Sequence, residues 1–429
     1  MSGAWWRCRT VTTLPWTCSS AMSDRSARLA AAPPSAPAVR STTPLWIVAG
    51  LAMSPAVALG LGRFAYALLL PAMRADLAWS YADAGAMNTA NAAGYLAGAL
   101  AFAPVTARLG PKRAFLAGLL VTAAALVASG LAASFLALLV LRLIAGAAGA
   151  VAFIAGAGLT AAAGAGGGPG RAPLALGIYF GGGGLGVVVS ALAVPPLLEA
   201  QGWRGGWVVL GALSFAATLL AVPALARAPA PAPRPASTEG VGRRVTVLVP
   251  TLVSYALFGA GYIAYMTFIV AYLRGQQGFS SRDVSLFWAG LGAASIAAVF
   301  AWAPVLGWLR AGWGIVATTG AVTIGAVLPL ASNEPIVAYL SAALFGGSFL
   351  AVIAAVTSVA RRATPPHAWT AVIGLLTTAF ALGQCVGPVL GGVLSDGPGG
   401  VRGGLLLSSA ILAAAVVIAA FQRETGDRK

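Results

Sequence analysis

The stretch Gly-Leu-Gly-Arg-Phe-Ala-Tyr at residues 60–66 lies inside the first long apolar run of the chain. Its charged residue is Arg63. An arginine near the middle of a bilayer costs at least about 2.5 kcal/mol, so such a residue is normally functional or tightly paired. A variant, Gly-Ala-Gly-Tyr-Ile-Ala-Tyr, occupies residues 259–265, with the glycines and the final tyrosine kept and Tyr262 replacing the arginine. The chain is therefore interpreted as two copies of one scaffold built around these stretches.

Composition places the chain among membrane proteins. Hydrophobic residues make up 59% of its 429 positions, charged residues only 8%, and the mean hydropathy is +0.88. A soluble domain carries roughly 25% charged residues, so this chain cannot present a surface suited to water. Apolar runs of about 20 residues recur, and each is long enough to cross roughly 30 Å of hydrocarbon. We predict an all-α membrane protein embedded in a lipid bilayer.

Twelve transmembrane helices are predicted, in two sets of six. The first set covers residues 46–71, 83–105, 113–132, 134–162, 172–198 and 206–226. The second set covers residues 246–273, 283–309, 312–331, 335–360, 368–394 and 402–421.

The spans define the predicted domains. The N-terminal six-helix half is residues 44–226, and the C-terminal six-helix half is residues 246–421. Between them, residues 227–245 are rich in Pro and Ala, a composition typical of an extended linker and not of a span. Residues 1–43 are polar, basic and rich in Ala, Pro and Ser, which predicts a disordered tail. Residues 422–429 form a second tail.

Lys and Arg indicate the orientation in the membrane. Of the 26 basic residues, 19 fall on the side of the termini, five on the opposite side and two inside spans. Cytoplasmic loops are enriched in Lys and Arg, so we expect both termini in the cytoplasm. This topology accounts for the net charge of +16 without nucleic acid as a partner. No signal peptide stands out, and the start at Met1 or Met22 is left open.

An internal repeat with an offset close to 200 residues supports two related halves. In each half a serine and an aspartate three positions later form a predicted capping box at the start of a span, at Ser80 and Asp83 and again at Ser280 and Asp283. Gly146 matches Gly346, and further pairs with an offset of 197 are Gly177 with Gly374 and Gly186 with Gly383. Six plus six spans related by a parallel repeat are typical of one class of secondary transporter.

The chain resembles the major facilitator superfamily over roughly residues 44–421. In that superfamily the loop between helices 2 and 3 carries a Gly, an Asp and a basic cluster. The matching positions here are Arg108, Gly110, Lys112 and Arg113, while Ala103 and Ala107 replace the first Gly and the Asp. The Asp that supports a charge relay in relatives is therefore absent from this position.

Two further motifs carry the resemblance. An Arg followed four residues later by Gly in helix 4 matches Arg142 and Gly146, and Gly149 follows. The run at residues 60–66 is similar to an uncharacterised bacterial branch of the superfamily. The resemblance implies a twelve-helix transporter of small solutes in a bacterial inner membrane, and that branch implies no particular substrate.

Catalytic and metal-binding patterns are absent from the sequence. His367 is the only histidine, the three cysteines have no CxxC spacing, and none of the ten acidic residues falls in the middle of a predicted span. We therefore expect no enzyme activity, no metal and no cofactor. The missing carboxylate also leaves proton coupling, uniport and exchange all open, because a coupling proton would have to use the substrate or a carboxylate at a helix end.

Arg63 and Arg142 are the central candidates for substrate binding. Helix 1 runs outward and helix 4 inward, so both guanidiniums are expected at nearly the same depth. Two buried cations without acidic partners favour an anion held through bidentate hydrogen bonds. Structural or gating roles for both arginines, and a neutral or cationic substrate, remain alternatives.

Aromatic and amide side chains on neighbouring spans could orient an organic substrate in a mostly apolar cavity. Interhelical hydrogen bonding by Asn and interfacial anchoring by Tyr are the competing explanations. The full set of predicted substrate-binding residues is Arg63, Tyr66, Asn88, Asn91, Arg142, Tyr262 and Tyr265.

Glycine motifs predict close helix packing. Gly383, Gly387 and Pro388 fit a GxxxGPxxGG spacing that belongs to helix 5 in proton-exchanging drug exporters, but here it lies in helix 11 and is interpreted as a packing bend. The predicted gating or packing residues are Gly60, Gly62, Arg108, Gly110, Lys112, Arg113, Gly146, Gly149, Gly259, Gly261, Gly383, Gly387 and Pro388.

These patterns predict a monomeric transporter that moves a small organic anion by alternating access of its two halves. The alternatives are broad-specificity efflux of amphipathic compounds and, in another functional class, a non-transporting membrane sensor or scaffold.

Overall fold

The computed structural model describes residues 43–165, 170–230, 246–365 and 368–423. Most of the two predicted tails and of the 227–245 linker, together with Met22 and His367, lies outside the described residues. Every secondary-structure element among the described residues is a helix, and none is a strand.

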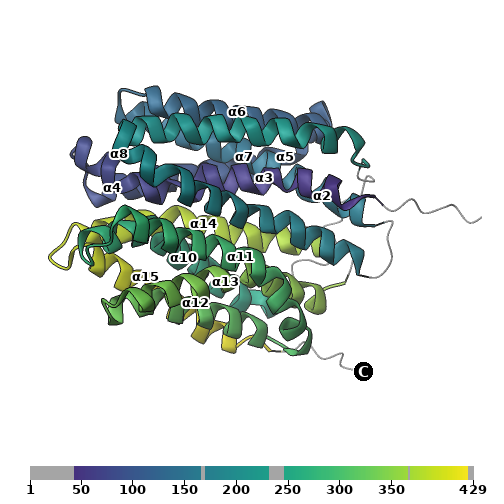
Figure 1. The fold of residues 1–429 in the computed structure, drawn as a ribbon. Coiled ribbons are helices and arrows are strands. Elements are labelled where there is room, and N and C mark those ends of the chain that lie inside the picture. The colour runs from purple at the N-terminus through teal and green to yellow at the C-terminus, as the bar shows by residue number, and fades with distance from the viewer. Residues whose placement is uncertain (1–42, 166–169, 231–245, 366–367, 424–429) are drawn as a thin grey trace, which may run out of the picture. The chain divides into compact units, whose positions relative to one another are not determined.

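The elements are labelled in Figure 1, where colour runs from purple to yellow along the chain. Those of the first half are α2 (Leu45–Leu51), α3 (Met53–Pro55), η1 (Ala56–Phe64), α4 (Tyr66–Asp76), α5 (Tyr81–Leu109), α6 (Pro111–Leu131), α7 (Phe135–Gly164) and α8 (Arg171–Arg227). Those of the second half are η2 (Thr246–Leu248), α10 (Val249–Gly275), α11 (Ser281–Trp308), α12 (Trp313–Ala331), α13 (Pro335–Ala363), α14 (Trp369–Ser395) and α15 (Gly400–Ala420).

The helices correspond to the predicted spans when α2, α3, η1 and α4 are joined into one span and α8 is divided into two. Elements α2 to α4 form one apolar segment, Leu45–Asp76. Helix α8 has 57 residues, about 85 Å at 1.5 Å per residue, which is too long for one crossing. Gly202 breaks it with φ 64° and ψ −171°, between the fifth and sixth predicted spans. Helix α11 bends by 48° between residues 298 and 300, and its two parts are long and apolar enough for one span only when taken together.

Both predicted capping boxes are confirmed. The Asp83 backbone N–H donates to Ser80 Oγ at 3.0 Å, and the Ser80 N–H donates to the Asp83 carboxylate at 3.0 Å. The same reciprocal pair joins Asp283 and Ser280 at 3.2 and 3.1 Å. Each box satisfies two amide groups that a helix start would otherwise leave unpaired, so α5 and α11 begin at repeat-related positions.

Helix contacts repeat between the halves. Helix α5 contacts α7 in the first half, as α11 contacts α13 in the second. The first helix, through η1, contacts α8, as α10 contacts α14. Across the halves, α5 contacts α14 and α8 contacts α11, two pairs that the repeat relates to each other.

Large apolar side chains remain exposed along several helices. Leu100, Leu192, Leu219 and Leu220 are each more than 60% exposed. In water such exposure would be costly, whereas hydrocarbon is as apolar as leucine. The exposed leucines therefore agree with a multi-pass membrane protein.

Candidate functional site

The first helix departs from α-helical geometry where it carries the arginine. Residues Ala56–Phe64 form a π-helical segment, and the Ala65 N–H donates to the Gly60 carbonyl five residues earlier at 3.0 Å. Such segments are rare and often occur at functional sites. A Cβ added at Gly60 would lie 2.8 Å from the Val187 backbone nitrogen, so only glycine permits this close approach to α8. The π-helical segment thus presents Arg63 to the second half while its backbone stays against α8.

Arg142 of α7 is buried beside this segment. Its Nη1 donates to the Gly62 carbonyl at 2.6 Å. Its guanidinium carbon lies 5.4 Å from the ring centroid of Tyr66 and 5.0 Å from that of Trp207, which are cation–π distances. Nε and Nη2 are buried without a hydrogen-bond partner. Two donors of the Arg142 guanidinium are therefore free to bond an acceptor from a ligand.

Arg63 reaches across to the second half. Its Nη2 donates to Gln384 Oε1 of α14 at 2.8 Å, and Gln384 Nε2 donates to the Tyr262 hydroxyl at 2.6 Å. The guanidinium carbon is 5.7 Å from the Tyr95 ring centroid. Arg63 Nε is also buried without a hydrogen-bond partner. Arg63 and Tyr262 occupy matching positions of the repeat. Both therefore bond the side-chain amide of Gln384, one at its oxygen and the other at its nitrogen.

No acidic side chain among the described residues neutralises the two arginines. The described aspartates and glutamates are all exposed or half-buried, whereas Arg63 and Arg142 are 2% and 1% exposed. Leaving a buried charge without a counter-charge costs several kcal/mol, roughly 3–5 in measured cases. A site with two such cations is electrostatically suited to an anion.

Two predicted residues lie with Arg142. The Tyr66 hydroxyl donates to the Ala84 carbonyl at 2.8 Å, and its ring stacks on Trp207 with centroids 6.2 Å apart. Asn91 Nδ2 donates to the Arg142 carbonyl at 3.1 Å. Tyr66 therefore forms one face of the guanidinium environment, and Asn91 ties α5 to the backbone of α7.

Asn88 and Tyr265 have different surroundings. Asn88 Nδ2 donates to Thr267 Oγ1 of α10 at 2.6 Å, and its Oδ1 is buried without a partner. The Tyr265 hydroxyl is bonded to Ser341 Oγ at 2.7 Å, and its ring stacks on Phe345 at 4.3 Å. Asn88 thus joins the two halves with one acceptor to spare. Tyr265 packs against α13, and its described contacts do not join it to either arginine.

The second half contributes stacked aromatic rings next to Gln384. The Tyr262 ring stacks on Phe258 at 5.1 Å, on Phe380 at 5.6 Å and on Phe349 at 6.0 Å. Phe349 in turn meets Phe64 edge-on at 5.8 Å, across the halves. An apolar wall therefore lies on one side of Arg63.

Gln384, Thr267, Trp207 and Phe349 are site residues that the sequence analysis missed. For Gln384 a signal existed, because it is the only glutamine inside any predicted span. The other three have no distinguishing feature in an apolar run, and their roles depend on how the helices are rotated against one another.

The glycine motifs lie at close helix crossings. A Cβ at Gly146 would lie 3.0 Å from the Tyr95 backbone nitrogen, and one at Gly149 would lie 3.3 Å from the Ala58 Cβ. Gly383 and Gly387 lie against the α10 backbone at Ala260, where added Cβ atoms would come within 3.0 Å. The remaining glycines of the set meet these neighbours: Gly62 the Val57 carbonyl, Gly259 Phe380 and Gly261 the Ser408 carbonyl. Pro388 stands inside α14.

The predicted loop motif connects helix ends within the first half. Gly110, with φ 76°, ends α5 and precedes α6. Lys112 Nζ donates to the Ala226 carbonyl at the end of α8 at 3.0 Å. Arg108 and Arg113 are exposed. A gating role for these residues stays a prediction.

Two carboxylates join the halves at the end of the bundle that carries residues 77–80 and 276–280. The backbone N–H groups of Tyr81 and Ala82 donate to Asp396 at 2.7 and 3.0 Å. Ser281 Oγ donates to Glu199 Oε1 at 2.6 Å. Asp396 and Glu199 are 197 positions apart, the repeat offset, so each half places one acid at the start of a helix in the other half.

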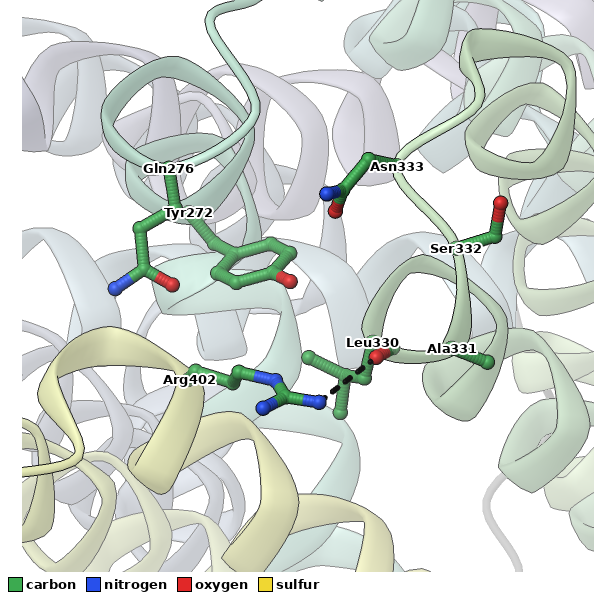
Figure 2. A pocket seen from close by; sticks show the side chains of 7 residues that line it. All are labelled: Tyr272, Gln276, Leu330, Ala331, Ser332, Asn333 and Arg402. Carbon is green, nitrogen blue, oxygen red and sulfur yellow. Dashed lines mark hydrogen bonds between the residues drawn. The ribbon is translucent and has the colours of Figure 1, made fainter.

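A pocket of ≈ 400 Å³ lies elsewhere, among residues that the sequence analysis did not select. Figure 2 shows its lining, in which Arg402 donates from Nη2 to the Leu330 carbonyl at 3.2 Å. Tyr272 lies in α10, and Gln276 directly follows the end of that helix. This pocket contains none of the predicted site residues.

Monocarboxylate transporter 11 from Homo sapiens is 28% identical over 261 residues, which is 56% of this chain and 54% of that protein. The match thus spans about half the length of that relative.

Solved structures share the fold. The crystal structure of the nucleoside transporter NupG has a TM-score of 0.67 at 13% identity, covering 88% of this chain and 100% of that one. An inward-facing, occupied bacterial homologue of the human lysosomal transporter Spinster has a TM-score of 0.63 at 16% identity, covering 88% of this chain and 96% of that one.

A family model covers most of the chain. The model described as uncharacterised MFS-type transporter YbfB matches residues 55–420, from the first helix through the last. The predicted superfamily and its all-helical fold are confirmed, and the ten or eleven candidate spans among the described residues are roughly consistent with the predicted twelve. The members of this superfamily are transporters and not enzymes. The chain belongs to this family, and it is a multi-pass membrane transporter of the major facilitator superfamily.

Proposed function

We propose that the transporter carries a small organic anion, bound through Arg63 and Arg142, by alternating access of its two halves. The observation that supports this most directly is that these two arginines together bury three guanidinium donors without acceptors: Arg63 Nε, Arg142 Nε and Arg142 Nη2. A buried donor left unpaired costs roughly 1–3 kcal/mol, and more on a charged group. A carboxylate supplies two oxygens and a negative charge at once, so it would satisfy the donors and the charge together.

The aromatic wall would receive the organic part of the substrate. Tyr262 and Phe349 lie on the Gln384 side of Arg63, and apolar rings bind carbon skeletons by excluding water. Asn88 Oδ1 is an unused acceptor, suited to a hydroxyl or another donor on the substrate. A monocarboxylate with an apolar or hydroxylated carbon skeleton has this combination, and the name of the human relative agrees with the class.

The two alternatives receive less support. Broad efflux of amphipathic compounds could use the same rings, but two buried guanidiniums repel the cations that many such compounds carry. A sensor or scaffold would act through residues 1–43 and 227–245, nearly all outside the described residues. The bacterial inner membrane, cytoplasmic termini and a monomeric state remain proposals that rest on the distribution of basic residues and on the family resemblance.

Ligand binding to the purified full-length protein tests the proposal. The thermal unfolding midpoint is measured with acetate, L-lactate, pyruvate and benzoate, and with lactamide and benzamide as uncharged counterparts. We expect the acids to raise the midpoint in a concentration-dependent way, since a ligand that binds only the folded state stabilises it by mass action. Equal responses to acids and amides would contradict an anion site.

Transport is then measured in proteoliposomes loaded with unlabelled acid, by the uptake of radiolabelled L-lactate. The variant tested is Arg63→Gln, and Arg204→Gln is its matched control. Like Arg142, Arg204 donates to a backbone carbonyl, at 2.7 Å, and stacks on an indole, that of Trp203, at 4.4 Å. We expect the control variant to retain uptake. Loss in Arg204→Gln equal to that in Arg63→Gln would indicate general damage and not a substrate contact.

A further inference from the structure

The geometry points to Gln384 as an internal stand-in for the substrate carboxylate: its amide occupies Arg63 in the unliganded protein and is displaced when an anion binds. This inference rests on the proposed function, because it names how that same site recognises its ligand.

The amide satisfies only part of the edge that Arg63 presents. In a guanidinium, Nε and one Nη lie side by side and match the two oxygens of a carboxylate. Gln384 Oε1 accepts from Nη2 at 2.8 Å, while Nε stays buried without a partner. A single amide oxygen leaves this second donor empty, whereas a carboxylate would fill both. Arg63 is therefore prepared for a two-oxygen acceptor that no described residue supplies.

The other end of the amide is fixed by the repeat. Gln384 Nε2 donates to the Tyr262 hydroxyl at 2.6 Å, and Tyr262 occupies the position in the second half that Arg63 occupies in the first. The position that matches Gln384 at the offset of 197 is Val187 of α8, fully buried and apolar. The first half thus has no equivalent amide, and one glutamine serves both copies of the motif.

Displacement of Gln384 would connect binding to motion. The Arg63–Gln384 bond joins η1 of the first half to α14 of the second. An anion that takes over Arg63 breaks this bond between the halves and forms stronger, charge-assisted bonds in its place. Ligand binding then shifts the equilibrium between two conformations only by the difference between the ligand's affinities for them, as any population shift requires.

Gln384→Met tests the competition. Methionine keeps a similar length and removes both polar atoms, so the internal competitor is lost. L-Lactate binding to the purified full-length protein, measured by titration calorimetry, is expected to become about tenfold tighter. If the amide instead binds substrate directly or only supports the helix, affinity will stay the same or fall, and either result would overturn the stand-in role. Gln422→Met is the control, since Gln422 is a buried amide bonded to Thr251 near the end of the second half.

Gln384→Glu tests the same idea without any ligand. A glutamate would offer Arg63 two oxygens and a charge, so we expect the thermal midpoint to rise by about 2–4 °C and L-lactate binding to fall at least tenfold. In an Arg63→Gln background the gain in midpoint should vanish. A gain that persists in that background, or no gain at all, would refute the pairing.

Acid binding by the wild type and coupling between the two substitutions together separate the stand-in role from the proposed function. If the wild-type protein binds none of the acids but the Gln384→Glu and Arg63→Gln substitutions couple as expected, the pairing stands and the organic-anion substrate fails. If acids bind and the substitutions do not couple, the substrate class stands and the stand-in role fails.

Discussion

The two halves of the molecule use the same backbone positions for different chemistry. In the first half the repeated stretch presents Arg63, and Arg142 of α7 lies beside it on the Gly62 carbonyl. In the second half the equivalent stretch presents Tyr262 within a stack of Phe258, Phe380 and Phe349. One half therefore holds positive charge that no described acidic residue neutralises, and the other holds an apolar wall.

The difference between the halves suggests that each half contacts a different part of the substrate. Helix starts, glycine crossings and inter-helix contacts are kept in both copies, because they hold the scaffold together. The side chains that point between the copies have diverged. We interpret the first half as the part that binds the charged end of a substrate and the second as the part that selects its organic end.

Removing the charge should have the largest effect. Arg63→Gln and Arg142→Gln, each alone, should lower L-lactate uptake at least about 30-fold in proteoliposomes, because truncating one partner of a buried charged pair costs roughly 2–5 kcal/mol. Size-exclusion profiles and the amount of inserted protein should remain as in the wild type. Uptake within tenfold of wild type in either variant would remove that arginine from the binding site.

Changing the aromatic wall should separate substrates by size. Phe349→Ala removes a ring that contacts both Tyr262 and Phe64 across the halves. Burial of an aromatic carbon skeleton contributes a few kcal/mol at most, so benzoate affinity should fall about tenfold. Acetate, which has almost no carbon skeleton, should change less than about twofold. Equal losses for both acids would mean that Phe349 supports the arginine and does not contact the organic end.

The sequence predicted the charged half better than the contact between the halves. Arg63 and Arg142 stand out in apolar runs, and the capping pairs follow a local rule that the structure confirms. The bond from Arg63 to Gln384 joins residues 321 positions apart, and it depends on a π-helical segment that no local pattern announces. Tyr265 shows the same limit: it matches Tyr66 in the repeat, yet it bonds Ser341. Spacing predicts which residues share a helix face, but the rotation of that face is set by packing.

The two carboxylates between the halves provide a smaller test. Asp396 accepts two backbone bonds at the start of α5, whereas Glu199 accepts one from the Ser281 side chain. Loss of a carboxylate that caps a helix start costs about 1 kcal/mol, and loss of one exposed side-chain bond costs less than about 0.5 kcal/mol. Asp396→Asn should therefore open this end of the bundle more than Glu199→Gln does. Spin labels at Trp79→Cys and Gly397→Cys, in a background without other cysteines, report the distance between the halves, and a larger effect of Glu199→Gln would contradict the assignment.

The smallest expected effect concerns the hydroxyl that holds the amide from the aromatic side. Tyr262→Phe keeps the ring stack but removes the acceptor of Gln384 Nε2. If Tyr262 helps to hold Gln384 against Arg63, its loss loosens the competitor, and L-lactate should bind about two- to threefold tighter, since the net value of one hydrogen bond is near 1 kcal/mol and water can replace part of it. If the hydroxyl instead binds substrate, affinity will fall by a similar factor, so the sign of the change decides between the two roles. Tyr339→Phe, which removes a hydroxyl bonded to Asp283 at 3.2 Å, is the control and should leave affinity unchanged. A tighter-binding Tyr262→Phe variant would show that the aromatic half tunes the charged half through a single shared amide, and not only through contact with the carbon skeleton.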